Sequence, residues 1–368
     1  MDGSSSKKFV EMKIKLFTDS LGAGGAQRQL VGLAVMLKQK GYDVSVVLYH
    51  EIPFFAKFLS NNGVPYSVLS GGANWISRIW VFYKYFKHER LDWVISYQET
   101  PSIIATICRV LGCKFQLIVS ERNVTQFIGF KEYARFYLYR WVDSIVPNSH
   151  TQCNFITKHY PRLKDKMTTI TNFVDLKYFS PLNHFRRNVP EILVVASIVS
   201  SKNTLGFIEA VKLLTLKGVK FHVSWYGKTS AYADYLNDCL FLINKYKIGE
   251  YIQLLDKVEN INLKYKEADY FCLPSFYEGT PNVICEAIAS GLPVMCSAVC
   301  DNGYYVKDGV NGVLFDPQNP HDMAHKIEQL LQQSESEYQN YCKSSREIAE
   351  DMLSEEAFVQ KYIEILLK

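Results

Sequence analysis

The sequence predicts an α/β protein made of two doubly wound domains, each built on a parallel sheet. Short apolar runs alternate with helical patterns along almost the whole chain, and these runs are too uniformly apolar for strands with one solvated face. The length of 368 residues is about that of two domains. An apolar content of 48% and a charged content of 21% allow both domains a large core.

The first domain begins with a βαβ unit. A strand at 13–18, a glycine-rich turn, a helix and a strand at 43–49 follow one another in KIKLFTDSLGAGGAQRQLVGLAVMLKQKGYDVSVVLYH. The helix has one apolar face, formed by Leu30, Leu33, Ala34 and Leu37. Further strands are predicted in LDWVISYQ, KFQLIVSERN and DSIVPNS, each of which ends in polar residues.

A second domain starts where this alternation is interrupted. The segment ITNFVDLKYFSPLNHFRRNVP is polar and irregular, and EILVVASIV then opens a new series of strands. The series continues with KFHVSWYG, YIQLLD, DYFCLPS, LPVMCSA and GVLFD, and helices are predicted at 231–247, in NINLKYKEA and at 281–290. We therefore expect a first domain at 1–175, a second at 176–350, and a last helix within 351–368 that crosses back to the first.

Composition argues against several classes of protein. No apolar run reaches the roughly 20 residues of a membrane span, and MDGSSSKKFVEMKIK lacks the apolar core of a signal peptide, so a cytoplasmic location is expected. The nine cysteines form no C-x-x-C and are expected to be reduced thiols, mostly buried. No Asp-x-Asp occurs, so no metal is expected. Basic residues predominate in the first half of the chain, which favours an anionic ligand there.

Ligands of doubly wound sheets bind beyond the carboxyl ends of the strands. This rule selects six segments of the chain for inspection: 19–27, 120–126, 197–203, 227–230, 256–260 and 275–286.

The last of these segments, in SFYEGTPNVICEAIASGLPV, combines two glutamates with a predicted helix start. Thr280 followed by Pro281 predicts an N-cap with proline at the first helical position, and such a helix end favours a phosphate. Glu278 and Glu286 lie eight apart, at most roughly 12 Å along a helix, which exceeds the spacing of a glycosidase pair. They are better placed to hold two parts of one elongated ligand. Alternatively, one is a surface residue and the other pairs with a lysine.

This stretch resembles the signature of the retaining glycosyltransferases of family 4. The resemblance is carried by Glu278-Gly279-Thr280-Pro281-Asn282, Glu286-Ala287 and Gly291-Leu292-Pro293-Val294, and by DGVNG at 308–312. It extends to GAGGAQRQLVGLA, ITNFVD and SSKN and thus spans nearly the whole chain. It implies the GT-B fold, in which two Rossmann-like domains face each other across a cleft.

The resemblance also implies roles for residues of the donor site. Glu278 would contact hydroxyls of the donor sugar, and Glu286 would accept hydrogen bonds from the ribose hydroxyls. Lys202 would stabilise the leaving diphosphate, so Glu278 and Lys202 are the predicted catalytic residues. The other predicted donor-binding residues are Gly24, Gly25, Ser197, Asn203, Gly279, Thr280, Pro281 and Asn282. The resemblance implies neither a metal nor a cofactor.

The sequence departs from the family pattern at two places. Family members usually have an arginine where this chain has Ser197, and Arg122, Arg28 and Lys228 are candidates for the missing cation. Many members also have a histidine in the first domain, where this chain has VSERNVT. Glu121 and Arg122 in that stretch contact sugar or phosphate in one interpretation and form a local salt bridge in the other.

The glycine-rich loop LGAGGAQRQ admits other interpretations. A dinucleotide fingerprint requires a third glycine where Gln27 stands, and Tyr49 and His50 occupy the end of the second strand where an acidic residue is expected. These differences disfavour a Rossmann oxidoreductase. The remaining alternatives are that Gly24 and Gly25 allow close approach to a sugar diphosphate, or that the loop is a plain turn.

The segment 74–93, NWISRIWVFYKYFKHERLDW, interleaves aromatic and basic residues, and FKEYARFYLYRW is similar. Such a helix suits the interface of an anionic membrane, although its aromatics could equally be core residues. Since the first domain of the family usually binds the acceptor, a lipid-linked acceptor is expected. Nucleic acid is not expected, because no recognition module is present.

The sequence therefore predicts a retaining, metal-independent hexosyltransferase. It would move a hexose or N-acetylhexosamine from a nucleotide sugar, with UDP favoured by its frequency in the family, to a hydroxyl of a lipid-linked saccharide in surface polysaccharide synthesis. The alternative is a nucleotide-sugar-binding protein of the same fold with little or no transferase activity.

Overall fold

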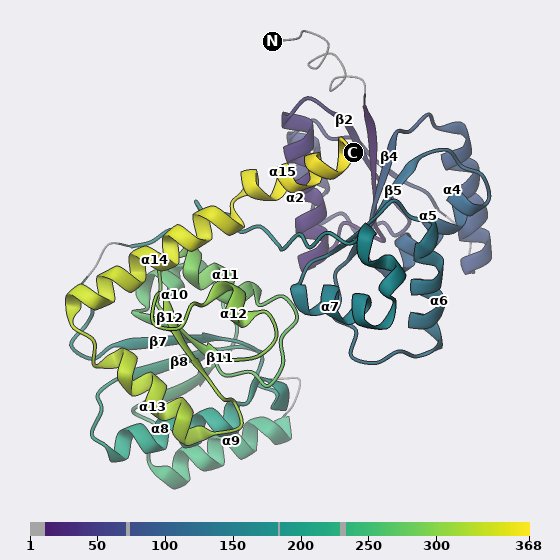
Figure 1. Cartoon of the computed structure of the whole chain (residues 1–368). Helices are drawn as coiled ribbons and strands as arrows, with labels where there is room; N and C mark the ends of the chain where they lie inside the picture. The colour runs from purple at the N-terminus through teal and green to yellow at the C-terminus, as the bar shows by residue number, and fades with distance from the viewer. Residues whose placement is uncertain (1–11, 71–73, 183–184, 229–232) are drawn as a thin grey trace. The chain divides into compact units, whose positions relative to one another are not determined.

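The computed structural model describes residues 12–70, 74–182, 185–228 and 233–368. The chain folds into two compact units (Figure 1). Unit 1 contains Met1–Asn172 and Phe358–Lys368, and unit 2 contains Phe173–Ala357. The predicted boundary after residue 175 lies close to this division, and the final segment assigned to unit 1 lies within the predicted last helix. Two sequence-based predictions concern residues outside the described ranges. They are the lack of a signal peptide at the start of the chain and the first residues of the predicted helix 231–247.

Unit 1 is built on a parallel sheet with the strand order β3-β2-β1-β4-β5-β6, here called sheet A. Its strands are β1 (Lys13–Phe17), β2 (Asp43–Leu48), β3 (Tyr66–Val68), β4 (Trp93–Tyr97), β5 (Gln116–Glu121) and β6 (Ser144–Pro147). Its helices are α2 (Gly25–Gln39), α3 (Ala56–Asn61), α4 (Trp75–His88), α5 (Glu99–Val110), α6 (Phe130–Leu138), α7 (His150–His159) and α15 (Glu355–Leu366), with 3-10 turns η1 (Tyr139–Trp141) and η2 (Pro161–Lys166).

Unit 2 repeats this topology on a second parallel sheet, here called sheet B, with the order β12-β11-β10-β7-β8-β9. Its strands are β7 (Glu191–Val195), β8 (His222–Tyr226), β9 (Ile252–Leu255), β10 (Tyr270–Leu273), β11 (Val294–Ser297) and β12 (Gly312–Phe315). Its helices are α8 (Thr204–Leu216), α9 (Ala233–Tyr246), α10 (Ile261–Glu267), α11 (Asn282–Ala289), α12 (Asn302–Tyr305), α13 (Pro320–Leu331) and α14 (Glu335–Leu353), with the 3-10 turn η3 (Ser200–Lys202).

Helices cover both faces of each sheet, as the apolar strands predict. In sheet B, α8, α9 and α13 pack on one face and α10, α11 and α14 on the other (Figure 1). In sheet A, α4, α5 and α6 cover one face, and the buried side of α2 packs against β2 and β4 on the other. The predicted apolar face of that helix is confirmed, because all four of its residues are buried.

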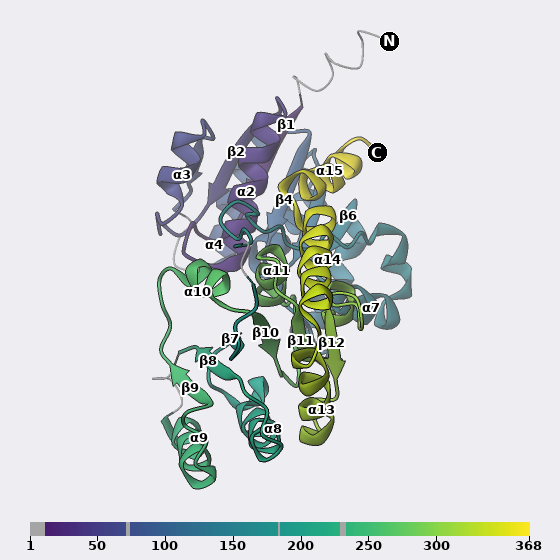
Figure 2. The same ribbon diagram turned by 90° about the vertical axis from the view of Figure 1, so that its left-hand side faces the viewer.

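The last helix, α15, packs on sheet A. It lies near α2 and β4 in both views of the molecule (Figure 1, Figure 2). The hydroxyl of Tyr362 in this helix lies 2.9 Å from that of Tyr97 in β4, and both residues are fully buried. A chain that has completed unit 2 thus returns to the core of unit 1.

Side-chain caps fix several helix starts where the sequence offers a suitable residue. The Asn74 side chain accepts a hydrogen bond from the Ser77 N–H at the start of α4, and Ser149 accepts one from the Gln152 N–H at the start of α7. Ser334 and Glu337 form a capping box at the start of α14.

All nine cysteines are free, and six of them are buried: Cys108, Cys113, Cys239, Cys272, Cys285 and Cys296. The prediction of reduced, mostly buried thiols is confirmed.

Candidate functional sites

In unit 2, the candidate site lies where β7 and β10 end. These neighbouring strands form the topological switch point of sheet B, because the chain leaves β7 toward β8 and leaves β10 toward β11, on the opposite side. Doubly wound sheets bind ligands at such a point. The turn η3 follows β7, and the loop at 274–281 follows β10. The N–H of Phe276 donates to the carbonyl of Ser201 over 2.9 Å, which fixes the two segments against each other.

This switch point brings together the two residues predicted to be catalytic. Lys202 Nζ lies 2.6 Å from Glu278 Oε1, although the two residues are 76 positions apart. The Lys202 side chain is 25% exposed and that of Glu278 is 9% exposed, so the pair is partly desolvated but reachable. An ammonium group carries three N–H donors, and Glu278 takes one of them. The others can bind an anion while the glutamate stays oriented by the lysine.

Glu286 lies in α11, eight residues after Glu278 in the preceding loop, and is held by a tyrosine. The Tyr265 hydroxyl donates to Glu286 Oε2 over 3.1 Å, and its oxygen also lies 3.2 Å from the carbonyl oxygen of Val283. Burial of Tyr265, and then the nearby charge of Glu286, raise the pKa of the tyrosine well above its ordinary value. Tyr265 therefore remains a hydrogen-bond donor and fixes one oxygen of the carboxylate.

The predicted N-cap of this helix is wrong. The residue at the cap position is Pro281, with φ −78° and ψ 70°, and the helix begins at Asn282. The Pro281 carbonyl accepts hydrogen bonds from the N–H groups of Ile284 and Cys285, and the Asn282 N–H donates to Thr280 O over 2.9 Å. The chain turns into the helix one residue later than a Thr-Pro start implies, because Pro281 itself has a non-helical ψ.

The other predicted donor residues of unit 2 differ in accessibility. Ser197 is exposed beyond the end of β7, close in sequence to Lys202. Asn203 is buried, has a left-handed backbone with φ 57°, and donates through Nδ2 to the carbonyl of Pro317 over 2.7 Å. Its amide thus holds the loop after β7 rather than facing a ligand. Lys228 is exposed after β8, the other neighbour of β7, whereas Arg28 and Arg122 belong to unit 1.

Sequence reasoning overlooked Cys300 in this site. It follows β11, the strand next to β10, and its φ of 48° is unusual for a residue with a side chain. Burial raises the pKa of its thiol, and a hydrogen bond with the backbone of Glu278 acts in the opposite direction. The thiol therefore lies against the loop that carries Glu278. Cys300 follows the predicted strand LPVMCSA, and ligands bind beyond the carboxyl ends of such strands. The sequence therefore held a signal for this residue, although the segment was not among the six selected.

Unit 1 has a pocket of about 230 Å³ at its own switch point, between β1 and β4. It is lined by Asp19, Ala26, Tyr49, Gln98, Glu99, Thr100, Pro101, Arg122 and Asn123. Gln98 has φ 71° and ψ 166°, a conformation that residues with a Cβ rarely adopt. Burial, followed by the charge of Asp19, raises the pKa of Tyr49 to about 12. Of these residues, the sequence had singled out Arg122 as a possible ligand contact.

Arg122 is held at this pocket by groups from distant parts of the chain. Its Nη1 donates to Asn172 Oδ1 over 3.0 Å, and its Nη2 donates to the hydroxyl of Tyr362 over 2.7 Å. The guanidinium also lies 4.2 Å from the centre of the Tyr97 ring. These partners are all uncharged, so Arg122 keeps its full positive charge for an anion in the pocket.

Glu121 does not fit the role of a sugar or phosphate contact. It is 1% exposed, accepts a short hydrogen bond from the Tyr139 hydroxyl, and lies 3.6 Å from Arg135 Nη2. The alternative, a salt bridge between Glu121 and Arg122, is also wrong, because the cation beside Glu121 is Arg135. As the last residue of β5, Glu121 points into the core of the unit.

The glycine-rich loop is tight but contains no left-handed glycine. A Cβ on Gly24 would lie 2.1 Å from Gln27 Oε1, whereas a Cβ on Gly25 would meet nothing within 4 Å. The Gln27 side chain reaches back over Gly24, and its Nε2 donates to Asp19 Oδ1 over 3.0 Å. Local packing thus accounts for one of the two glycines, and close approach of a ligand remains a proposal for Gly25.

The aromatic residues of α4 are divided between core and surface. Phe82 and Phe86 are buried, whereas Trp75 and Trp80 are exposed together with Lys84. Part of the segment 74–93 thus contributes to the core, and part of it lies at the surface. Within the described parts of the chain, no helix is long and apolar enough to cross a membrane. No three His, Cys, Asp or Glu side chains of those parts gather as metal ligands would.

Comparison with known proteins agrees with this architecture. The model described as "Glycosyltransferase Family 4" matches residues 23–178, and the model described as "Glycosyl transferases group 1" matches residues 189–333. The chain belongs to glycosyltransferase family 4. The first match covers most of sheet A, and the second covers the switch point of sheet B.

Relatives named as glycosyltransferases match much of the chain, and solved structures share its fold. An α-1,4-N-acetyl-D-galactosaminyltransferase of Campylobacter jejuni, whose named substrate is a diphospho-undecaprenol-linked saccharide, is 25% identical over 87% of this chain and 89% of its own length. An α-1,3-galactosyltransferase of Escherichia coli is 25% identical over 64% of this chain and 65% of its own length.

Among solved structures, Anabaena HepE with UDP superimposes with a TM-score of 0.82 at 16% identity, covering 97% of this chain and 100% of HepE. A glycosyltransferase of Rickettsia africae gives 0.80 at 19% identity, covering 96% and 97%. The predicted GT-B fold is confirmed.

Proposed function

We propose that this family 4 protein is a retaining, metal-independent hexosyltransferase that takes a hexose or N-acetylhexosamine from a UDP sugar. The observation that carries the proposal is the Lys202–Glu278 pair at the switch point of sheet B, with Glu286 held nearby by Tyr265. A partly desolvated cation, a sugar-facing carboxylate and a second carboxylate for the ribose form the set of groups that a nucleotide sugar requires.

In this proposal each group acts where charge or hydroxyls of the donor lie. Lys202 stabilises the negative charge that develops on the diphosphate as the bond to the sugar breaks. Glu278 accepts hydrogen bonds from sugar hydroxyls and, through its ion pair, keeps the Lys202 ammonium in place. Glu286 accepts hydrogen bonds from the ribose hydroxyls, while Tyr265 fixes the orientation of its carboxylate. Gly279, Thr280, Pro281 and Asn282 line the turn before α11, where the diphosphate would lie.

The acceptor is proposed to be a saccharide linked to a lipid diphosphate and used in building a surface polysaccharide. Relatives whose names include diphospho-undecaprenol acceptors match much of the chain, and they come from more than one organism. In unit 1, the pocket at Arg122 offers a cation with uncharged partners, which suits a sugar close to a phosphate.

A membrane surface is the proposed partner of α4. Trp75, Ile76 and Trp80 are exposed on this helix beside Lys84, and Phe54 and Phe58 are exposed after β2. The segments after β2 and β3 leave sheet A at the same edge as the Arg122 pocket, so these apolar side chains belong to the same end of unit 1. Apolar side chains beside cations favour the interface of an anionic membrane. The proposed location is the cytoplasm, at the inner face of the membrane.

The proposal is tested by incubating the purified protein with UDP-glucose, UDP-galactose and their N-acetyl derivatives and a panel of synthetic saccharides on a lipid diphosphate. The expected result is transfer of one sugar with retention of the anomeric configuration, read by NMR of the product. Transfer is expected to persist with EDTA present. An inverted product, or loss of transfer that added Mg²⁺ or Mn²⁺ restores, would contradict the mechanism.

The exposed Ser197, in place of the usual arginine, favours one other candidate function. A protein with a single diphosphate cation at this point would bind nucleotide sugars with little turnover. Binding of UDP without transfer or hydrolysis of any of the four donors would support this alternative.

A further inference from the structure

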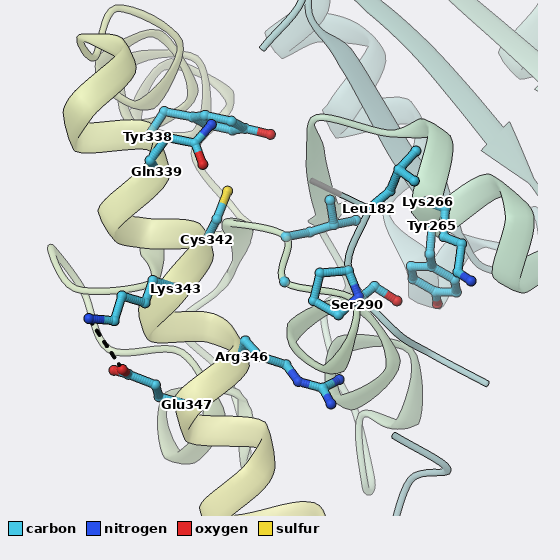
Figure 3. A pocket seen from close by; sticks show the side chains of 13 residues that line it. Leu182, Tyr265, Lys266, Ser290, Tyr338, Gln339, Cys342, Lys343, Arg346 and Glu347 are labelled. Carbon is cyan, nitrogen blue, oxygen red and sulfur yellow. Dashed lines mark ion pairs between the residues drawn. The ribbon is translucent and has the colours of Figure 1, made fainter. Parts of the chain in front are cut away.

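Unit 2 has a second pocket, on the other side of α11 from the donor site. It has a volume of about 260 Å³ and is bounded by α14, the end of α10, the turn after α11 and Pro181–Leu182 (Figure 3). The chain passes through α11 from the carboxyl end of β10 to the start of β11, so its final turn lies at the opposite edge of sheet B from Lys202 and Glu278. This pocket is therefore separate from the proposed donor site.

A buried hydroxyl without a partner lies in the wall of this cavity. Ser290 is 4% exposed, lines the pocket, and has no hydrogen-bond partner for Oγ among the described residues. A buried unpaired hydroxyl costs about 1–3 kcal/mol, and native structures leave few such groups unsatisfied. A ligand that accepts a hydrogen bond from Ser290 would remove this cost.

Two cationic side chains add further donors to the same lining. Arg346 donates through Nη1 to the carbonyls of Leu176, Phe179 and Ala289. Its Nε forms an ion pair of 2.7 Å with Glu350, while the described residues offer its Nη2 no acceptor. Lys266 contributes an ammonium group that has no ion-pair partner among the described residues. The side chains at the edge of the pocket, Lys343 and Glu347, form an ion pair of 3.7 Å with each other and point away from its centre (Figure 3). Lys266 thus gives the lining a positive charge that no carboxylate of the described residues balances, and Arg346 Nη2 adds a donor.

The rest of the lining is apolar. Pro181, Leu182 and Leu292 face the space together with the ring of Tyr265 and the Cys342 side chain. Burial raises the pKa of the Cys342 thiol to about 12, so this group adds no negative charge. A fully solvated ion such as phosphate alone would leave these apolar walls unfilled.

We propose that this pocket is a second ligand site, which binds a small anion carried on an apolar body, such as a carboxylate or phosphate on an aromatic ring. The anionic group accepts hydrogen bonds from Ser290, Lys266 and Arg346 Nη2, and the ring packs against Leu182 and Tyr265. Tyr265 is the residue through which this site would contact the donor site, because its hydroxyl holds Glu286. The proposal does not depend on transferase activity.

Benzoate and phenyl phosphate are the probes that test it, titrated against the full chain by saturation-transfer NMR, with benzyl alcohol as the neutral control. At least one anion is expected to saturate, and benzyl alcohol is expected to bind at least about tenfold more weakly, since a charge-assisted hydrogen bond is lost. The stronger of the two probes shows whether the site prefers a carboxylate or a phosphate. UDP at saturation is expected not to displace the probe.

Two variants locate the binding. Lys266→Met should weaken it about tenfold. Ser290→Ala should weaken it about threefold while raising thermal stability, because the change removes a buried hydroxyl that makes no hydrogen bond in the free protein. Lys264→Met is the matched control, since Lys264 lies in the same helix and pairs with Glu267 outside the pocket. Saturation by neither anion, equal weakening in Lys264→Met, or displacement of the probe by UDP would each overturn the proposal.

Discussion

Glu121 in unit 1 and Glu278 in unit 2 both lie at the carboxyl edge of a parallel sheet and beside a cation, yet their surroundings differ sharply. The Glu121 side chain is 1% exposed and that of Arg135 is 3% exposed. In the other pair, Lys202 is 25% exposed and sits at a switch point. Glu121 ends strand β5 itself, whereas Glu278 lies in the loop beyond β10.

This difference separates a structural pair from a functional one. A carboxylate fixed in the last residue of a strand takes its direction from the pleat and enters the core, where a cation must accompany it. A carboxylate in a loop beyond the strand can face the ligand. The two units share one topology, and the position of each carboxylate relative to its strand end determines which pair is available to a donor.

Removal of the cation from the buried pair should have the largest effect. In Arg135→Met, the free energy of unfolding is expected to fall by about 3–5 kcal/mol, because Glu121 is left as a buried charge without a partner. Lys202→Met is the matched substitution in unit 2 and should cost less than about 1 kcal/mol. Urea denaturation followed by circular dichroism measures both. Equal losses would remove the distinction between the pairs.

The pH dependence of the Arg135→Met variant sharpens the same comparison. Burial raises the pKa of Glu121 above its ordinary value even with Arg135 present. A raised carboxyl pKa contributes stability at pH below about 4.5 that is lost as pH rises through the folded-state pKa. Since removal of the cation raises this pKa further, the loss in Arg135→Met should be larger at pH 8 than at pH 5. A loss that does not vary with pH would show that Glu121 is not the group affected.

Substitution of the accessible carboxylate should affect catalysis rather than folding. Glu278→Gln is expected to reduce transfer about a hundredfold or more, because Lys202 loses its ionic partner and the sugar loses a charged acceptor. Unfolding by urea should be nearly unchanged. Glu267→Gln, at the exposed end of α10, is the control and should retain full activity. An active Glu278→Gln enzyme would remove Glu278 from the site.

Tyr362→Phe tests how unit 1 holds its own cation. The change removes the acceptor of Arg122 Nη2 and the partner of the buried Tyr97 hydroxyl, at a cost of about 1–2 kcal/mol in stability. The KM for the acceptor should rise more than kcat falls, because Arg122 loses its orientation. Tyr133→Phe, at an exposed tyrosine of unit 1, should change neither. An unchanged KM would show that Arg122 does not contact the acceptor.

Ser197→Arg should have the smallest effect. Ser197 is exposed close to Lys202, so an arginine there should fit without loss of stability and add a second cation for the diphosphate. UDP affinity, measured by calorimetry, is expected to rise about threefold at low salt and less at high salt. Unchanged affinity at low salt would show that this position does not face the diphosphate.

Local sequence signals predicted the frame of the molecule well. Short apolar runs in the sequence located eleven of the strands. The alternation of these runs with helical patterns predicted both parallel sheets. The short strand β3 was not predicted, because YSV is too short to show a period. The Thr280 cap failed for a comparable reason, since the backbone angles of Pro281 could not be inferred from the residue types.

Contacts between distant residues were harder to predict. Lys202 and Glu278 were each chosen from a family motif, but their ion pair depends on β7 and β10 being neighbours. Tyr362 and Asn172 carry no signal that relates them to Arg122, because the segments meet only in the folded unit. Arg135 lies in α6, which is separated from Glu121 by a loop. The sequence therefore suggested the adjacent Arg122 as the partner of Glu121.

In the proposed function, the donor nucleotide binds at the switch point of sheet B. Calorimetric titration with UDP of the wild type, Lys202→Met and Arg122→Met tests it most directly. Lys202→Met should weaken UDP binding at least about tenfold, since a charge-assisted contact to the diphosphate is lost, and Arg122→Met should change it less than about threefold. Loss of UDP binding in Arg122→Met with full binding in Lys202→Met would contradict the account and place the nucleotide in unit 1.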